Sequence, residues 1–126
     1  MVTKGPSTKV VGDAAEALAL AHLTRRGLTL VRRNYRVAKG PGARAGEVDL
    51  ILREPDGTLV FVEVRSRHSM SHGGAAASVG TTKRRSLLWA ARHFLLAIDP
   101  VPPCRFDVVA IDGDRVEWLR AAFDAS

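Results

Sequence analysis

The pattern of apolar and polar residues predicts two helices and five strands. Residues 13–26 and 82–97 repeat apolar side chains at helical spacing, and Gly27 stands where a helix-ending glycine is expected. Asp13 and Glu16 form a D-x-x-E capping box, which predicts that the first helix begins at residue 13. Shorter runs rich in Val, Leu, Ile and Phe predict strands at 28–37, twice within 46–67, at 105–111 and at 115–119.

The order of these elements predicts one α/β domain. A three-strand antiparallel meander is expected to pack on the two helices, and the last two strands are expected to extend the sheet. Residues 1–10 are expected to form a flexible tail, which leaves 11–126 as the domain. The final residues, RAAFDAS, are expected to form a short tail at the other end.

The sequence Glu-Pro-Asp-Gly at 54–57 joins two of the strands and predicts their register. Pro and Asp suit the central positions of a type I turn, and Gly57 suits the left-handed residue that follows. In the resulting three-residue loop, the numbers of facing residues sum to 112, so Asp49 stands opposite Glu63. The other face of the hairpin is then apolar, formed by Val48, Leu50, Leu52, Val60, Val62 and Val64.

Two carboxylates placed opposite each other on a sheet face repel one another. A shared proton, a basic neighbour or a divalent cation could offset the repulsion between Asp49 and Glu63. Mg²⁺ usually takes one or two carboxylates and keeps several waters, so we expect a Mg²⁺ or Mn²⁺ site here. The alternative is that Arg65 and Arg53, which are near the pair in sequence, neutralise it.

Composition and charge narrow the class of protein. Of the 126 residues, 46% are hydrophobic and 25% are charged, as in ordinary globular domains. There is no apolar run that could span a bilayer and no signal-peptide centre, and Cys104 is the only cysteine, so a reducing cytoplasm is expected. The net charge is +6, and residues 25–44 hold seven basic residues and no acidic one. This segment indicates nucleic acid or an anionic membrane surface as partner, unless it is only a solvated basic face.

Six segments carry a resemblance to a known family: GDAAEALALAHL, GEVDLIL, VFVEVRSR, GGAAASV with TKRR after it, CRFDVVAI and VEWL. Together they resemble the bacterial YraN family, which is similar to archaeal Holliday-junction resolvases and to the PD-(D/E)xK nuclease superfamily. The resemblance covers Gly12 to Phe123 and implies a restriction-endonuclease-like core. It implies a Mg²⁺-dependent DNA endonuclease of repair or recombination, or a DNA- or RNA-binding module that keeps the fold without turnover. The implied partner is branched or single-stranded DNA rather than a membrane, and the implied assembly is a homodimer.

The resemblance also assigns roles to individual residues. Glu16 matches the acid of the first helix, and Asp49 and Glu63 match the strand acid and the acid of the E-x-K motif, which bind the metal. Arg65 stands where the superfamily usually has Lys; it can stabilise charge on a phosphate but cannot act as a general base. Lys83 is a candidate to supply an ammonium group from the next element. The capping box explains Glu16 equally well, so both of its roles stay open.

Cations expected to contact phosphates are Arg32, Arg33, Arg36, Arg67, Lys83, Arg84 and Arg85. The last three crowd the start of the second helix, where they oppose the helix dipole but where free N–H groups also bind anions. Asp107 is expected to be a paired strand residue rather than a metal ligand. Trp89 and Trp118 are expected to pack against the protein rather than to stack on bases.

Overall fold

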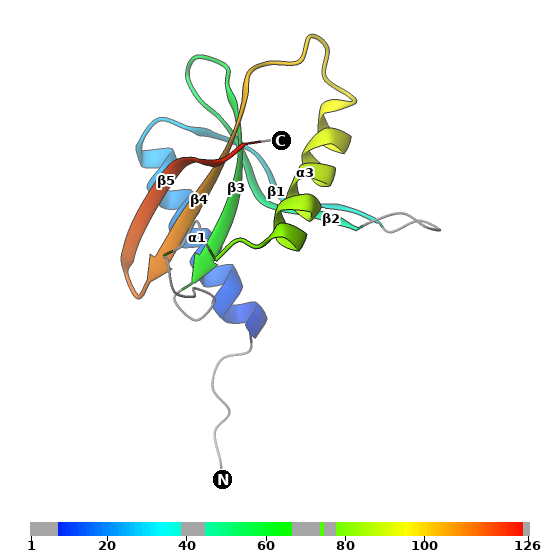
Figure 1. Cartoon of the computed structure of the whole chain (residues 1–126). Helices are drawn as coiled ribbons and strands as arrows, with labels where there is room; N and C mark the ends of the chain where they lie inside the picture. Colours follow the sequence, from blue (N-terminus) through cyan, green and yellow to red (C-terminus); the bar gives the residue numbers. More distant parts are fainter. Residues whose placement is uncertain (1–7, 39–44, 67–73, 75–77, 125–126) are drawn as a thin grey trace.

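Five strands form one mixed sheet with a helix on each face (Figure 1). The computed structural model describes residues 8–38, 45–66, 74 and 78–124. The elements follow in the order α1 (Thr8–Arg25), β1 (Thr29–Val37), β2 (Gly46–Arg53), β3 (Leu59–Ser66), α3 (Thr81–Leu95), β4 (Cys104–Asp112) and β5 (Arg115–Phe123). This is the predicted order of helices and strands, and it makes a single α/β domain.

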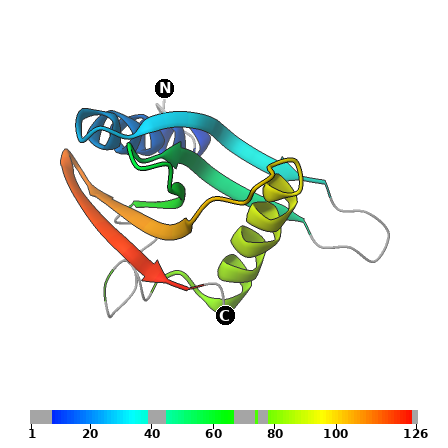
Figure 2. The ribbon, with the colours of Figure 1, turned by 90° about the horizontal axis from the view of Figure 1, so that it is seen from above.

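The strands lie in the sheet in the order β1-β2-β3-β4-β5. Neighbouring strands are antiparallel except for β3 and β4, which run parallel. A parallel pair requires a crossover connection, and α3 lies in the one between β3 and β4. The two helices cover opposite faces of the sheet (Figure 2). In the part of the chain that the structure describes, neither helix is long and apolar enough to cross a membrane.

Helix α1 ends at the predicted glycine. Gly27 has a φ of 98°, a left-handed conformation that glycine adopts without strain. The amide of Gly27 donates to the carbonyl of Thr24 at 3.1 Å, and the amide of Leu28 donates to the carbonyl of Leu23 at 3.2 Å. This pair of bonds is a Schellman motif, which ends the helix and directs the chain into β1.

The start of α1 differs from the prediction. The helix begins at Thr8, inside the expected tail, so Asp13 and Glu16 lie within the helix and the predicted capping box is wrong. Residues 8–12 contain no proline, and a glycine inside a helix costs only about 1 kcal/mol, so nothing local stops the helix before residue 13. Residues 1–7 of the predicted tail lie outside the described part of the chain.

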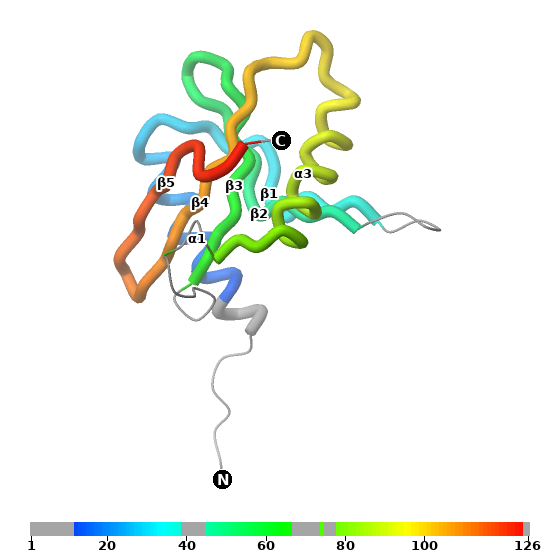
Figure 3. The backbone as a smooth tube through the Cα atoms, viewed as in Figure 1, coloured from blue at the N-terminus to red at the C-terminus, as the bar shows by residue number. Residues whose placement is uncertain are grey.

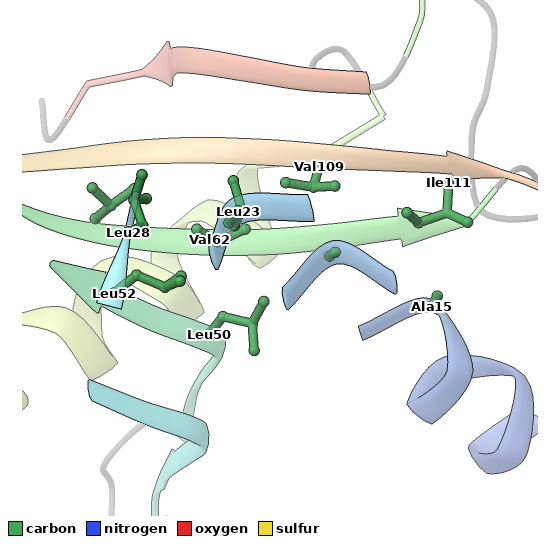
Figure 4. Close-up of a cluster of buried hydrophobic side chains, with 10 residues drawn as sticks. Ala15, Leu23, Leu28, Leu50, Leu52, Val62, Val109 and Ile111 are labelled. Carbon is green, nitrogen blue, oxygen red and sulfur yellow. The ribbon is translucent and has the colours of Figure 1, made fainter. Parts of the chain in front are cut away.

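Two apolar clusters hold the helices to the sheet. On one face, Ala15 and Leu23 of α1 lie against strand side chains that include Leu50 and Val62 (Figure 4). On the other face, the predicted apolar stripe of α3 packs on β2, β3 and β4. The buried members of this second cluster are Val48, Ile51, Leu59, Phe61, Leu87, Ala90, Ala91 and Phe106. Full burial of one large apolar side chain contributes about 1.5–3 kcal/mol, so the clusters supply most of the drive to fold.

The β2–β3 hairpin has the predicted turn and register. Gly57 has a φ of 96°, the amide of Glu54 donates to the carbonyl of Thr58 at 2.9 Å, and the amide of Gly57 donates to the carbonyl of Glu54 at 2.9 Å. The paired residues have numbers that sum to 112: Leu50–Val62, Ile51–Phe61, Leu52–Val60 and Arg53–Leu59. The predicted pair Asp49–Glu63 would come next in this register, but the ladder ends at Leu50–Val62.

Beyond Leu50 the two strands of the hairpin separate. The β2–β3 ladder stops at the pair Leu50–Val62, while β2 stays paired with β1 as far as Gly46. The two strands leave the rest of the sheet together and pass α3 (Figure 3). Val48 therefore packs in the α3-side cluster, and its predicted place on the other face with Leu50 is wrong. Gly46 lies so close to α3 that a β-carbon there would stand 2.8 Å from the amide nitrogen of Ala90.

Strand β5 is longer than predicted, and a buried carboxylate holds it. The strand runs to Phe123, so most of the expected C-terminal tail is part of the sheet. Asp107 has no exposed surface and accepts hydrogen bonds from Arg105 at 2.9 Å, from Nε1 of Trp118 at 2.8 Å and from the amide of Ala121 at 2.9 Å. These contacts confirm that Asp107 is a paired strand residue and that Trp118 is a packed one.

Candidate active site

Asp49 and Glu63 lie where the sheet opens. In a continuing ladder, Val64 would pair with Val48, because their numbers sum to 112. The amide of Val64 donates to Oδ2 of Asp49 at 2.8 Å, so this carboxylate occupies the place of a backbone partner. Both acids are buried, with 8% of Asp49 and 3% of Glu63 exposed. The opening thus positions one carboxylate by a backbone bond and leaves it beside the second.

The pKa values of both acids are raised. Burial, the negative charge of Asp49 and a hydrogen bond between the two side chains raise the pKa of Glu63 from its ordinary 4.5 to about 8. Burial also raises the pKa of Asp49, against the opposing effect of the Val64 amide. A carboxyl group with a pKa of about 8 keeps its proton at neutral pH, and this relieves the repulsion between the two acids. This is one of the three ways in which the repulsion was expected to be offset.

A basic neighbour is also present, and it comes from α3. Nζ of Lys83, in the first turn of that helix, lies 3.6 Å from Oε1 of Glu63. Burial dominates the pKa values of both acids, and the charge of Lys83 lowers both. The side chain of Lys83 is 39% exposed, whereas that of Glu63 is 3% exposed, so the ammonium group connects the acids to the surface. The structure thus brings Asp49, Glu63 and Lys83 together, as predicted.

The arginines named as alternative partners of the acids hold neighbouring segments of the chain. Nε of Arg65 donates to Oγ of Ser78 at 3.2 Å, and Nη2 donates to the carbonyl of Ser78 at 3.5 Å. Nη1 of Arg53 donates to the carbonyl of Gly57 in the hairpin loop at 3.3 Å. Arg65 therefore ties β3 to the segment before α3, and its charge has only a small lowering effect on the pKa of Glu63, which burial dominates.

Glu16 approaches the acid pair from α1. Burial and the charge of Asp49 raise its pKa to about 6, against lowering effects of Arg33 and Asn34 on β1. Its Oε1 is buried and has no hydrogen-bond partner among the described residues. Within the same residues, no three His, Cys, Asp or Glu side chains are grouped closely enough to hold a metal ion. The carboxylate oxygens of Asp49 and Glu63 are donors of the kind that Mg²⁺ accepts, and Mg²⁺ usually keeps several waters besides one or two carboxylates.

The predicted phosphate contacts on β1 lie at the surface. Arg32, Arg33 and Arg36 are all exposed. The guanidinium of Arg32 lies over the ring of Tyr35, 5.4 Å from its centroid. A nitrogen of Arg36 lies 3.7 Å from a carboxylate oxygen of Glu47, and the side chain is 70% exposed, so this ion pair is weak and screened by solvent. These side chains are accessible to a phosphate backbone.

The predicted phosphate contacts on α3 divide into two kinds. Arg85 is exposed. Arg84 is half-buried: its Nε donates to the carbonyl of Val79 at 2.9 Å, and its guanidinium lies 5.0 Å from the centre of the Phe123 ring. The structure thus gives Arg84 a role in holding the start of α3, while its contact with phosphate stays a prediction. Arg67 lies outside the described residues.

Sequence reasoning missed two features around the site. The first is Ser78, whose side chain accepts a hydrogen bond from Arg65. The sequence does not indicate this contact, because the two residues meet only when the chain folds. Trp89 was expected to pack but is 40% exposed. Its position on the helix, away from the buried Leu87 and Ala91, was a signal that could have shown this.

Comparison with known proteins identifies relatives along most of the chain. A model of the family described as "Uncharacterised protein family UPF0102" matches residues 15–111, which include all the acids of the site and Lys83. A UPF0102 protein of Methylibium petroleiphilum is 62% identical over 120 residues, which cover 95% of this chain and 98% of that protein. A UPF0102 protein of an Acidovorax species is 58% identical over 120 residues, which cover 95% of this chain and 89% of that protein. A solved structure, described as the crystal structure of SSO0001, matches 90% of this chain with a TM-score of 0.43 and 18% identity; the match spans 52% of that chain.

Proposed function

This chain belongs to the UPF0102 family, the YraN family that its sequence resembles, and we propose that it is a Mg²⁺- or Mn²⁺-dependent DNA endonuclease of the PD-(D/E)xK type. One observation carries the proposal: the carboxyl groups of Asp49 and Glu63 are buried together, and the ammonium group of Lys83 lies 3.6 Å from Glu63. A folded protein gains nothing from burying two acids face to face, and such perturbed pairs cluster at functional sites. The reaction is hydrolysis of a phosphodiester bond.

Asp49 and Glu63 are the residues that would hold the cation, and bound Mg²⁺ would polarise a phosphate oxygen and lower the pKa of a water molecule. Asp49 is positioned by the amide of Val64, which donates to its Oδ2 at 2.8 Å. Glu63 has to release its proton to become a ligand, so cation affinity rises with pH towards its pKa of about 8.

Lys83 supplies the positive charge that the lysine of the E-x-K motif supplies elsewhere. Its ammonium group lies 3.6 Å from Glu63, and its side chain is 39% exposed, so it can contact a phosphate that enters from solvent. A fixed cation at this point stabilises the negative charge that develops on the phosphoryl group during attack. Arg65, which is bonded to Ser78, then acts by positioning β3 against the segment before α3.

The surrounding charges support DNA as the substrate. Three arginines of β1 are exposed, and α3 carries four Lys and Arg residues without an acidic one. A phosphate backbone is the polyanion that such a surface attracts, and each contact adds salt dependence to the affinity. We place this activity in the cytoplasm, because a chain with one cysteine forms no internal disulfide and suits a reducing compartment. We assign it to DNA repair or recombination, as the family resemblance implies.

Cleavage of several DNA forms by the purified protein tests the proposal. Wild type is expected to cut duplex, single-stranded or branched DNA with Mg²⁺ or Mn²⁺ and to cut none of them in EDTA. Asp49→Asn and Glu63→Gln are expected to lower the rate by at least about 10²-fold. Glu47→Gln is the matched control, because Glu47 lies on the same strand but is half-exposed and paired with Arg36. Cutting that survives in Asp49→Asn, or in EDTA, would overturn the assignment.

Thermal unfolding tests the cation site without relying on activity. A cation that binds only the folded chain stabilises it by about 2.7 kcal/mol at a hundred times its Kd. Wild type is therefore expected to melt at a higher temperature with millimolar Mn²⁺, while Asp49→Asn is expected to show no such shift. Equal shifts of the melting temperature in both proteins would show that the cation binds elsewhere than at the acid pair.

A nucleic-acid-binding module without turnover is the second candidate. The observation that favours it is the engagement of Arg65, the residue at the lysine position of the motif, with Ser78. Such a module would bind DNA, and Asp49→Asn would bind it at least as well, because one negative charge is lost. Neither wild type nor Arg65→Lys would then cut DNA with any divalent cation.

A further inference from the structure

Trp89 is a large aromatic side chain exposed on a helix that carries only positive charges. It is 40% exposed, although tryptophan is highly buried on average in folded proteins. The sequence of α3, TTKRRSLLWAARHFL, contains four Lys and Arg residues and no Asp or Glu. An aromatic ring among cations, with part of its face in water, is suited to a ligand that has both flat rings and negative charges.

Two arginines flank Trp89 along the exposed side of the helix. Arg85 precedes it by four residues and Arg92 follows it by three, and these spacings place side chains on one helix face. Both arginines are exposed. Along the helix axis they stand about 6 Å and about 4.5 Å from Trp89, at 1.5 Å per residue. Arg85 and Arg92 therefore stand about one helical turn before and after Trp89 on the same face.

Trp89 also lies close to the acid pair. Its Cδ1 would be 2.9 Å from a β-carbon on Gly46, so the ring lies against the start of β2. From Gly46 to Asp49 the strand advances three residues, about 10 Å. From Lys83 to Trp89 the helix advances six residues, about 9 Å. Both paths put the ring about three nucleotides from the acids, at 3.4 Å per nucleotide of a stacked strand.

We propose that Trp89 stacks on a base of single-stranded DNA whose phosphates contact Arg85 and Arg92, next to the acid pair. The inference rests on the proposed function and names its substrate class as DNA with an unpaired segment. Bases inside a duplex are stacked on one another, whereas an unpaired base offers its face to an aromatic ring. The all-cationic helix favours a polyanion over an apolar protein surface as the partner that covers Trp89.

Binding measured in EDTA tests the inference separately from cleavage. Fluorescence anisotropy compares one labelled oligonucleotide as a single strand and as a blunt duplex. Trp89→Ala is expected to weaken single-strand affinity about 5- to 150-fold and to leave duplex affinity unchanged. Trp89→Phe is expected to keep most of the affinity. Leu96→Ala is the matched control, because it removes an 83% exposed apolar side chain just after the same helix and is expected to bind as wild type does.

Tryptophan fluorescence gives a second measurement, and its comparison variant, Trp89→Phe, keeps an aromatic ring at this position. Single-stranded DNA is expected to quench the emission of wild type, and to leave the emission of Trp89→Phe, where only Trp118 emits, unchanged. Equal single-strand affinity of wild type and Trp89→Ala would overturn the inference, as would equal losses on both DNA forms. Self-association that disappears in Trp89→Ala without DNA would also overturn it. Single-strand binding through Trp89 with no cutting would support it and overturn only the proposed endonuclease.

Discussion

The buried carboxyl group of Glu63 makes the stability of the protein depend on pH, and Glu63→Gln removes that dependence. Burial and the charge of Asp49 raise the pKa of Glu63 to about 8 in the folded chain, against 4.5 for an ordinary glutamate in the unfolded chain. Between these pH values the folded state keeps a proton that the unfolded state has released. The free energy of unfolding therefore falls as pH rises: the contribution is full below about pH 4.5 and is lost by about pH 8.

The size of the effect follows from the same two values. One proton changes the free energy of unfolding by at most about 1.4 kcal/mol per pH unit. The difference between 8 and 4.5 is 3.5, so the whole loss is at most about 5 kcal/mol. Relaxation of the site on ionisation reduces it, and roughly 2–4 kcal/mol is expected. Glutamine resembles the protonated acid in shape and stays neutral, so the variant should match wild type near pH 5 and exceed it by this amount near pH 8.

Urea unfolding in EDTA, followed by circular dichroism at both ends of this pH range, measures the difference by linear extrapolation. Glu47→Gln is the control, because Glu47 is half-exposed and its removal should give no gain that grows with pH. A gain of Glu63→Gln that is equal near pH 5 and near pH 8 would refute the raised pKa of Glu63. So would a wild-type stability that rises through this range.

The remaining predictions concern catalysis, DNA contact and packing. Lys83→Ala is expected to lower the cleavage rate about 10²- to 10³-fold. Arg65→Ala is expected mainly to lower the free energy of unfolding, by about 1 kcal/mol. Equal losses of cleavage in the two variants would contradict these roles. Arg85→Ala should reduce the slope of log affinity against log salt concentration by about 0.7–0.9. An unchanged slope would show that Arg85 does not contact a DNA phosphate. Gly46→Ala puts a β-carbon 2.8 Å from the amide nitrogen of Ala90 and is expected to cost about 1–3 kcal/mol in urea unfolding; unchanged stability would show that α3 can shift to accept it.

The order of the elements could be predicted from local patterns in the chain, and so could the hairpin turn that brings the two acids onto neighbouring strands. Gly27 ends α1 because a left-handed backbone favours glycine, and this preference acts within a few residues. The turn at 54–57 determined the hairpin register for the same reason, and Asp49 and Glu63 lie next to each other just beyond the last pair of that ladder. Signals of this kind can be interpreted without knowing what packs against them.

The surroundings of the two acids could not be predicted from the sequence. The β2–β3 ladder breaks beyond Leu50 because β2 follows β1 past α3, and the Val64 amide then bonds to Asp49. The position of α3 on the sheet brings Lys83 to 3.6 Å from Glu63 and leaves Trp89 exposed. Each of these contacts joins groups that are distant in sequence and meet only in the folded chain. The three-dimensional packing of the helices on the sheet decides them, and no local pattern in the chain records the result.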